Sequence, residues 1–276
     1  MKIDFMILGA QKCGTTTLFD ILNSHPKVSG SSPKEPHFFS TTPDWKKNLG
    51  EYYKIYDQQK ENVLRFEAST DYTFYPYRNL NIWDTLHEIN PEMKHIYIVR
   101  NPKQRIVSAY MHMFSRGYLD LPIDEALLEE KLLIGVSRYY TQIKPFIDKF
   151  GRDKVLLLDF ADLVKDVETT VEKVAAFLGI SMSDFPADYQ TIRSNVSLGN
   201  KRGHHKLDKL TLPQKVLKKV APSVWYKMSD NSDRSFAQKP SLSAAQQQVV
   251  VDLLDLEILE IEKLLGKDLS SWRVIS

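Results

Sequence analysis

Residues 9–17 combine glycine, lysine and hydroxyl side chains in an order that is typical of an anion-binding loop. An apolar run ends at Gly9, Lys12 follows within a short loop, and helical spacing of apolar residues begins after Gly14. The first N–H groups of a helix favour a nearby anion by roughly 0.3–1 kcal/mol. Consecutive hydroxyl donors follow: Thr15, Thr16 and Thr17. We expect a phosphate or sulfate group to bind here.

The glycine spacing of this loop also fits the nucleoside-triphosphate loop G-x-x-x-x-G-K-S/T. Gly9 and Gly14 match its glycines, but Thr15 stands where its lysine belongs, and the lysine of this chain lies inside the loop at Lys12. Cys13, the single cysteine of the chain, lies in the same loop. We interpret it as a small side chain rather than as a reactive thiol.

A second set of polar residues follows another apolar run. Asn101 and Pro102 are a good helix start, because asparagine caps the first turn and proline suits the first helical position. Arg100 precedes this helix, and Ser108 lies two turns, about 10 Å, beyond Asn101. The planar guanidinium suits a phosphate, which Arg100 and Ser108 can hold jointly. We expect Arg105 to be solvated or salt-bridged.

Apolar runs alternate with helical patterns along the chain. The runs that we expect to form strands are 3–8, 63–67, 94–99 and 154–160. The helical patterns cover 15–24, 139–150, 166–178 and 243–265. This order predicts an α/β protein with a P-loop-like three-layer α/β/α fold and a central parallel sheet of about four to five strands. Ligands gather at the carboxyl ends of such strands, which brings 12–17, 67–72 and 100–108 together.

Two segments lack clear periodicity. In 29–59, prolines at positions 33 and 36 exclude a regular helix across them, and we expect an irregular segment that is pinned by aromatic residues and either walls a pocket or covers the surface. In 183–242, the basic stretch 201–206 either closes over a second phosphate or is a solvated loop. His204 and His205 lack the partners of a metal site.

Length and composition favour one domain. The chain has 276 residues, 42% of them hydrophobic, and we expect a single domain over 1–276 with its core in 1–180 and 241–276. A net charge of +2 does not indicate a nucleic-acid partner, and no run approaches the roughly 18 apolar residues of a membrane span. One cysteine forms no internal disulfide, which fits a reducing compartment. We expect a soluble, cytoplasmic protein and leave its oligomeric state open.

Together, the two anion motifs resemble those of the sulfotransferases that use 3′-phosphoadenosine 5′-phosphosulfate (PAPS) as donor. The likeness is closest to the heparan-sulfate-type and related bacterial enzymes. The similar stretches are 11–17, 33–39, 100–110, 139–150, 154–163 and 266–272. Only 183–242 is weakly similar.

The resemblance implies an enzyme that moves a sulfuryl group from PAPS to a hydroxyl or amine of a carbohydrate or other small-molecule acceptor, by in-line displacement without a metal. It makes Glu35 the general base and Lys12 the charge that neutralises the bridging oxygen. We take His37 as a reserve base, because the unperturbed pKa of histidine lies closer to neutrality. The donor-binding residues that it implies are Lys12, Cys13, Gly14, Thr15, Thr16, Thr17, Arg100, Ser108, Arg202 and Gly203.

One departure from the family concerns a second catalytic lysine. Many relatives have Glu-Lys-Ser where this chain has Glu67-Ala68-Ser69. Lys34 is a candidate for the missing charge. The same lysine offers an alternative for Glu35, which is then a partner in a surface ion pair.

Two other functional classes stay open. A kinase or nucleotidase that uses ATP and Mg²⁺ is supported by Asp159, an acid at the end of an apolar run. The missing lysine after Gly14 and the positive charge of Arg100 oppose this class. The second alternative is a catalytically silent nucleotide-binding module or a nucleic-acid binder that uses 201–219, and the near-neutral net charge opposes nucleic-acid binding.

Overall fold

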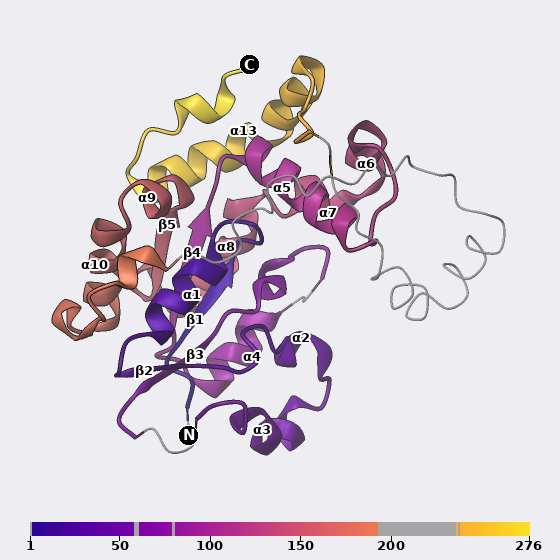
Figure 1. Cartoon of the computed structure of the whole chain (residues 1–276). Helices are drawn as coiled ribbons and strands as arrows, with labels where there is room; N and C mark the ends of the chain where they lie inside the picture. The colour runs from indigo at the N-terminus through magenta and orange to yellow at the C-terminus, as the bar shows by residue number, and fades with distance from the viewer. Residues whose placement is uncertain (1, 58–60, 79–80, 193–235, 237) are drawn as a thin grey trace.

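Within the part of the chain that the structure describes, five parallel strands form a central sheet (Figure 1). The computed structural model describes residues 2–57, 61–78, 81–192, 236 and 238–276. The strand order is β2-β3-β1-β4-β5. The strands are β1 Phe5–Gly9, β2 Val28–Gly30, β3 Leu64–Glu67, β4 Lys94–Val99 and β5 Val155–Asp159. The predicted α/β fold with a central parallel sheet is confirmed.

Helices cover the sheet and extend beyond its carboxyl edge (Figure 1). They are α1 Thr15–Asn23, α2 Phe38–Thr41, α3 Trp45–Tyr53, α4 Ile82–Ile89, α5 Pro102–Ser115, α6 Ile123–Glu129, α7 Lys131–Gly135, α8 Tyr139–Phe150, α9 Phe160–Lys165, α10 Val167–Leu178 and α13 Ala244–Leu265. A short 3₁₀ helix, η1 (Thr70–Thr73), follows β3. Among the described residues, no helix combines the length and apolar character of a membrane span.

Successive residues of β4 show that helices pack on both faces of the sheet. Lys94 donates to the carbonyl of Phe177 in α10 at 2.6 Å, whereas the ring of His95 packs against Phe150 of α8, with centroids 4.3 Å apart. Neighbouring residues of a strand point to opposite faces, so α10 and α8 lie on opposite sides. α1 packs through Phe19 on the same face as α10.

Capping residues explain the predicted helix ends. The side chains of Asn101 and Ser243 accept hydrogen bonds from the first turns of α5 and α13. Gly179 and Gly266 end α10 and α13 in the left-handed conformation, which glycine adopts without steric cost. The sequence therefore places both ends of α10 and α13, and the start of α5, correctly to within a residue.

The segment 29–59 is more regular than the sequence predicts. It contributes the end of β2 and all of α2 and α3. β2 has only three residues, too few to show the alternation of apolar and polar residues by which a strand is recognised in a sequence. As expected, no helix crosses the two prolines, and Phe38 of α2 stacks on Tyr52 of α3 with ring centroids 4.5 Å apart. Tertiary packing of aromatic rings, rather than local periodicity, orders these short elements.

The backbone of Gly14 leads to a stability prediction. Gly14 has a φ of +86°, and a Cβ atom there would lie 2.8 Å from the ring of Phe160. We expect Gly14→Ala to lower the free energy of unfolding by about 1–3 kcal/mol in urea titrations, because alanine is strained at this φ and collides with the ring.

Gly50 is a matched control in the interior of α3. Apart from the adjacent residues and the nearby backbone of α3, no atom of the described residues lies within 4 Å of a Cβ placed on Gly50. We expect Gly50→Ala to raise the free energy of unfolding by about 0.5–1 kcal/mol, because alanine is the better helix former. Equal effects of the two substitutions would contradict the close packing at Gly14.

Candidate active site

The loop between β1 and α1 directs backbone N–H groups toward one point. Gly14 is the N-cap of α1, and as a glycine it offers no side chain to the first N–H groups of this helix. Lys12 has a left-handed backbone with a φ of 68°. Thr15 is buried, whereas Thr16 and Thr17 are half-buried. The structure therefore brings the predicted lysine and threonines to the start of one helix, where an anion is favoured.

Lys12 lies in a partly buried, positively charged setting. Burial lowers the pKa of Lys12, the charge of Arg100 lowers it further, and Glu35 opposes both by raising it. An anion beside Lys12 and Arg100 is attracted by both charges, and partial burial limits screening by solvent.

Arg100 joins the two predicted anion motifs. Its Nη1 donates to the backbone carbonyl of Lys12 at 3.1 Å, and its guanidinium lies over the ring of Phe160, 4.5 Å from the centroid. The hydroxyl of Tyr139 donates to the carbonyl of Arg100 at 2.7 Å. Within the described residues, the buried Nε of Arg100 has no hydrogen-bond partner. The guanidinium thus connects the loop after β1 with the end of β4.

Helix α5 carries the rest of the second motif. Ser108 is half-buried, and among the described residues it makes no hydrogen bond to Arg100. Arg105 is fully buried and no acid pairs with it in the described part of the chain, so the prediction of a solvated or salt-bridged arginine is wrong. Its Nε donates to the hydroxyl of Ser137 at 2.6 Å, and its Nη2 donates to the carbonyl of Leu133. Packing of α7 on α5 removes Arg105 from water, which a helical period cannot reveal.

Glu35 lies in the loop between β2 and α2, close to the end of β3. Its Oε1 is 2.5 Å from Nζ of Lys34, so the ion pair considered for these two residues forms. Its Oε2 lies 3.5 Å from Oγ1 of Thr70 and 3.8 Å from Nε2 of His37. The loop is anchored to the strand because the N–H of Ala68 donates to the carbonyl of Lys34 at 3.1 Å. Glu35 therefore sits at the carboxyl edge of the sheet with one oxygen paired to a lysine.

His37 interacts with an acid that sequence reasoning did not single out. Nδ1 of His37 lies 2.7 Å from Oδ1 of Asp71 in η1. The hydrogen bond to Asp71 raises the pKa of His37, burial opposes this, and Glu35 also raises it. The sequence marks 67–72 as the end of a strand, but the contact depends on how η1 turns.

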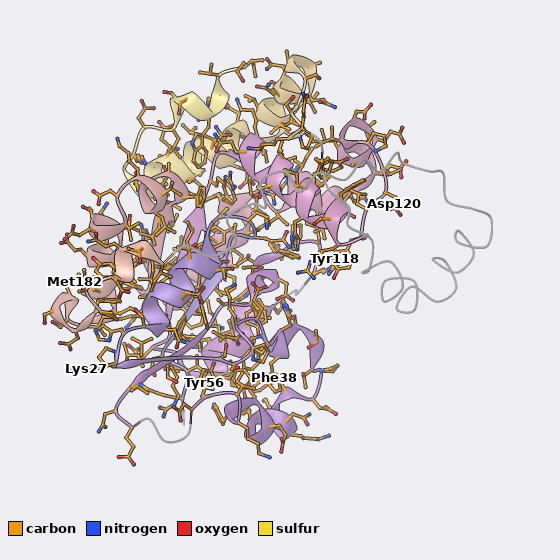
Figure 2. The ribbon with its side chains drawn as sticks, in the orientation of Figure 1. Lys27, Phe38, Tyr56, Tyr118, Asp120 and Met182 are labelled. Carbon is orange, nitrogen blue, oxygen red and sulfur yellow. The ribbon has the colours of Figure 1, made fainter. Side chains whose placement is uncertain are left out.

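Glu67 is a second acid that sequence reasoning did not assign. It is fully buried at the end of β3 and accepts hydrogen bonds from the hydroxyls of Tyr52 (2.6 Å), Tyr72 (3.0 Å) and Ser69 (2.6 Å). Burial raises the pKa of Glu67 to about 7, although the three hydrogen bonds oppose the rise. Tyr56, labelled in Figure 2, extends the cluster, with its hydroxyl 3.2 Å from that of Tyr52. Glu67 thus links β3 to Tyr52 of α3 and Tyr72 of η1.

Two further groups approach the anion loop from the end of α5. The positive charges of Lys12 and Arg116 both act on His112, and Arg116 also lowers the pKa of Lys12. Burial, followed by Lys12 and Arg116, lowers the pKa of His112 to about 4. The sequence could have indicated that these two groups lie near the site: they follow Ser108 at intervals of four residues, and residues four apart share one face of a helix.

Asp159 is already occupied by the C-terminal segment. Its Oδ2 lies 2.5 Å from Nζ of Lys267, and its Oδ1 accepts from the N–H of Ala161 at 2.9 Å as the cap of α9. Lys267 also bonds to Asp162 at 2.6 Å. Among the residues that the structure describes, no three His, Cys, Asp or Glu side chains come together as metal ligands.

The remaining predicted site residues divide into a buried group and an undescribed group. Cys13 is fully buried, and burial raises the pKa of its thiol to about 11, in keeping with a small packing residue. Arg202, Gly203, His204 and His205 lie outside the described residues.

The chain is similar in sequence to known sulfotransferases. A family model described as "Sulfotransferase domain" matches residues 2–264. Carbohydrate sulfotransferase 15 of Mus musculus is 23% identical over 249 residues, which cover 64% of this chain and 43% of that protein. Heparan sulfate glucosamine 3-O-sulfotransferase 3A1 of Mus musculus is 25% identical over 185 residues (63% and 45%), and cytosolic sulfotransferase 14 of Arabidopsis thaliana is 30% identical over 196 residues (66% and 55%). This chain spans about half the length of these relatives.

Solved structures share the fold. A sulfotransferase from Alicyclobacillus acidocaldarius superposes with a TM-score of 0.70 at 25% identity, covering 99% of this chain and 100% of the other. Mouse sulfotransferase SULT7A1, complexed with PAP, has a TM-score of 0.53 at 17% identity, covering 96% and 88%. The family model extends over nearly all of the sheet and the site described above. The chain therefore belongs to the sulfotransferase family.

Proposed function

We propose that this chain transfers a sulfuryl group from PAPS to a hydroxyl or amine of a carbohydrate or other small-molecule acceptor. The observation that carries the proposal is the 3.1 Å hydrogen bond from Arg100 to the carbonyl of Lys12, because it joins two anion-binding loops. PAPS has a phosphosulfate on one side of its adenosine and a phosphate on the other, so one donor can engage both loops. PAP, present in the mouse neighbour, is the nucleotide that PAPS becomes when the sulfuryl group leaves.

The proposed donor site lies at the carboxyl ends of β1 and β4. The backbone N–H groups and side chains of 12–17 bind the 5′-phosphosulfate, where the start of α1 favours an anion. Arg100 and Ser108 bind the 3′-phosphate, and the buried Nε of Arg100, which has no partner among the described residues, is a further donor. Arg202 and Gly203 complete this side in the proposal, as the family resemblance implies.

In the proposed reaction, the acceptor oxygen or nitrogen attacks sulfur in line with the bond to the nucleotide. The acceptor–sulfur bond forms while the sulfur–oxygen bond to the phosphate breaks, and PAP leaves with the electron pair. Glu35 takes the acceptor proton, and Lys12 neutralises charge on the leaving oxygen. Positioning and charge neutralisation supply most of the rate.

Lys34 is proposed to replace the lysine that many relatives have at the position of Ala68. Its Nζ already lies 2.5 Å from Oε1 of Glu35, at the carboxyl edge of the sheet. A positive charge there stabilises negative charge that develops on the transferring group. The proposal is supported by the position of Lys34, because the N–H of Ala68 donates to the carbonyl of Lys34 at 3.1 Å and so brings the two residues side by side.

No observation in the described residues favours the kinase class. Asp159, its best support in the sequence, pairs with Lys267 and caps α9. The second alternative is a module that binds the nucleotide without catalysing transfer. This alternative is supported only if sulfur-labelled PAPS transfers its label to no acceptor in a screen of sugars, phenols and amines.

Nucleotide binding gives the first functional prediction. Without added metal, adenosine 3′,5′-bisphosphate at 100 times its Kd should stabilise the chain by about 2.7 kcal/mol, a rise in Tm of about 5 °C. Lys12→Ala and Arg100→Ala should each abolish most of this rise in a thermal-shift measurement, because each removes a charge from the anion site. Lys47→Ala, which removes a lysine exposed on α3, should leave it unchanged. Stabilisation only by ATP with Mg²⁺ would favour the kinase class instead.

The general base gives the second functional prediction. Glu35→Gln should lower kcat for sulfuryl transfer by about 10²–10⁴-fold, because the amide cannot take the acceptor proton. KM for PAPS should change little. Glu51→Gln, the same change at an exposed residue of α3, serves as the control. Full activity of Glu35→Gln would show that Glu35 is not the base, and His37→Ala would then test the reserve base.

A further inference from the structure

Three ionisable groups lie in series beside the proposed transfer site. Oδ1 of Asp71 is 2.7 Å from Nδ1 of His37, and Nε2 of the same ring is 3.8 Å from Oε2 of Glu35. The groups come from separate places: Asp71 lies in η1 after β3, whereas Glu35 and His37 lie before α2. The imidazole thus stands between two carboxylates, each facing a different ring nitrogen.

Both members of the pair formed by Asp71 and His37 are held in place. Oδ2 of Asp71 accepts a hydrogen bond from the hydroxyl of Ser40 at 2.6 Å. The backbone N–H of His37 donates to the hydroxyl of Ser69 at 3.0 Å, and Ser69 in turn donates to Glu67 at 2.6 Å. The hydroxyl of Ser40 also lies 3.0 Å from the backbone carbonyl of His37, so Ser40 contacts both the carboxylate and the backbone that carries the ring.

The position of Asp71 selects one tautomer of neutral His37. A carboxylate accepts hydrogen bonds only, so the proton of the neutral ring lies on Nδ1, toward Asp71. Nε2 then presents its lone pair toward Glu35. A ring with the other tautomer would offer Glu35 an N–H and could not accept a proton from it.

We propose that Asp71 is a positioning residue of this site, which holds His37 so that Nε2 receives the proton that Glu35 takes from the acceptor. This inference rests on the proposed function and adds a residue that the family resemblance does not supply. It gives His37 a role as the second proton carrier rather than as a replacement base.

The proposed proton path balances without a co-reactant. The acceptor O–H or N–H bond breaks as sulfur is attacked, and the proton binds Oε2 of Glu35. The carboxyl group then turns toward the ring, because 3.8 Å is longer than a hydrogen bond, and passes the proton to Nε2. The transfer restores the negative charge of Glu35. The product is an imidazolium that lies between the carboxylates of Asp71 and Glu35.

The charges around His37 favour this product. The ring is faced by Asp71 and Glu35, Glu67 acts from further away, and Lys34 lies on the far side of Glu35. The hydrogen bond to Asp71 is the largest cause that raises the pKa of His37, and burial is the main opposing cause. Because neutral His37 is the form that accepts a proton, kcat should rise with pH as His37 deprotonates. Loss of the Asp71 charge should move that rise to lower pH.

Asp71→Asn tests the inference, with Asp44→Asn as the matched control at an exposed aspartate. Ring-nitrogen NMR of histidine-labelled protein, with His37→Ala to assign one signal among seven histidines, reports tautomer and pKa without any need for activity. We expect the proton on Nδ1 in the parent chain, and a lower His37 pKa in Asp71→Asn, because the hydrogen bond and the charge that raise it are lost. Asp44→Asn should change neither.

Activity provides the second readout. Asp71→Asn should lower kcat at neutral pH by about tenfold or more, leave KM for PAPS unchanged, and shift the rising limb of the pH profile to lower pH. Asp71→Glu should restore part of kcat. An unchanged His37 titration, or a loss of kcat with an unshifted profile, would overturn the inference. A parent chain that shows the expected titration but sulfates no acceptor would instead overturn the proposed function and, with it, the proton path, while the pairing of Asp71 with His37 would stand.

Discussion

The hydrogen bond from Nη1 of Arg100 to the carbonyl of Lys12 holds together the two loops on which the site depends. The two residues are 88 positions apart, but β1 and β4 are parallel neighbours, so their carboxyl ends meet at one edge of the sheet. The ring of Phe160, which follows β5, stacks on the guanidinium of Arg100 and lies close to Gly14. Three strand ends therefore fix one arginine.

The electrostatic balance of the site follows from that arrangement. Lys12 and Arg100 are both partly buried, burial lowers the pKa of each, and Glu35 is the acid that raises the pKa of Lys12. Holding two cations this close is unfavourable for the chain and favourable for a bound dianion. The end of β3 holds the residues proposed to carry the proton. The N–H of Ala68 bonds to the loop that contains Glu35, and the hydroxyl of Ser69 accepts from the N–H of His37.

Local rules were enough to predict most of the framework. Asn101, Ser243, Gly179 and Gly266 mark helix ends by their chemistry, and long apolar runs mark strands. β2 was missed because three residues carry too little pattern. The Lys12 loop and Arg100 could be identified because their spacing along the chain reflects the geometry that an anion requires.

Contacts between distant segments were not predictable in the same way. Arg105 reads as a surface arginine on a helix, and only the packing of α7 buries it. The approach of Asp71 to His37 depends on the turn of η1 after β3, and the burial of Glu67 depends on tyrosines from α3 and η1. Each of these depends on how elements pack, which neither periodicity nor capping residues encode.

A crystal structure of the chain with bound adenosine 3′,5′-bisphosphate tests the central claim most directly. We expect one phosphate to contact the backbone N–H groups and hydroxyls of 12–17, and the other phosphate of the same molecule to contact Arg100 and Ser108. A nucleotide that binds with no contact to Arg100 and Ser108, or that occupies neither loop, would contradict the claim that the two loops form one donor site.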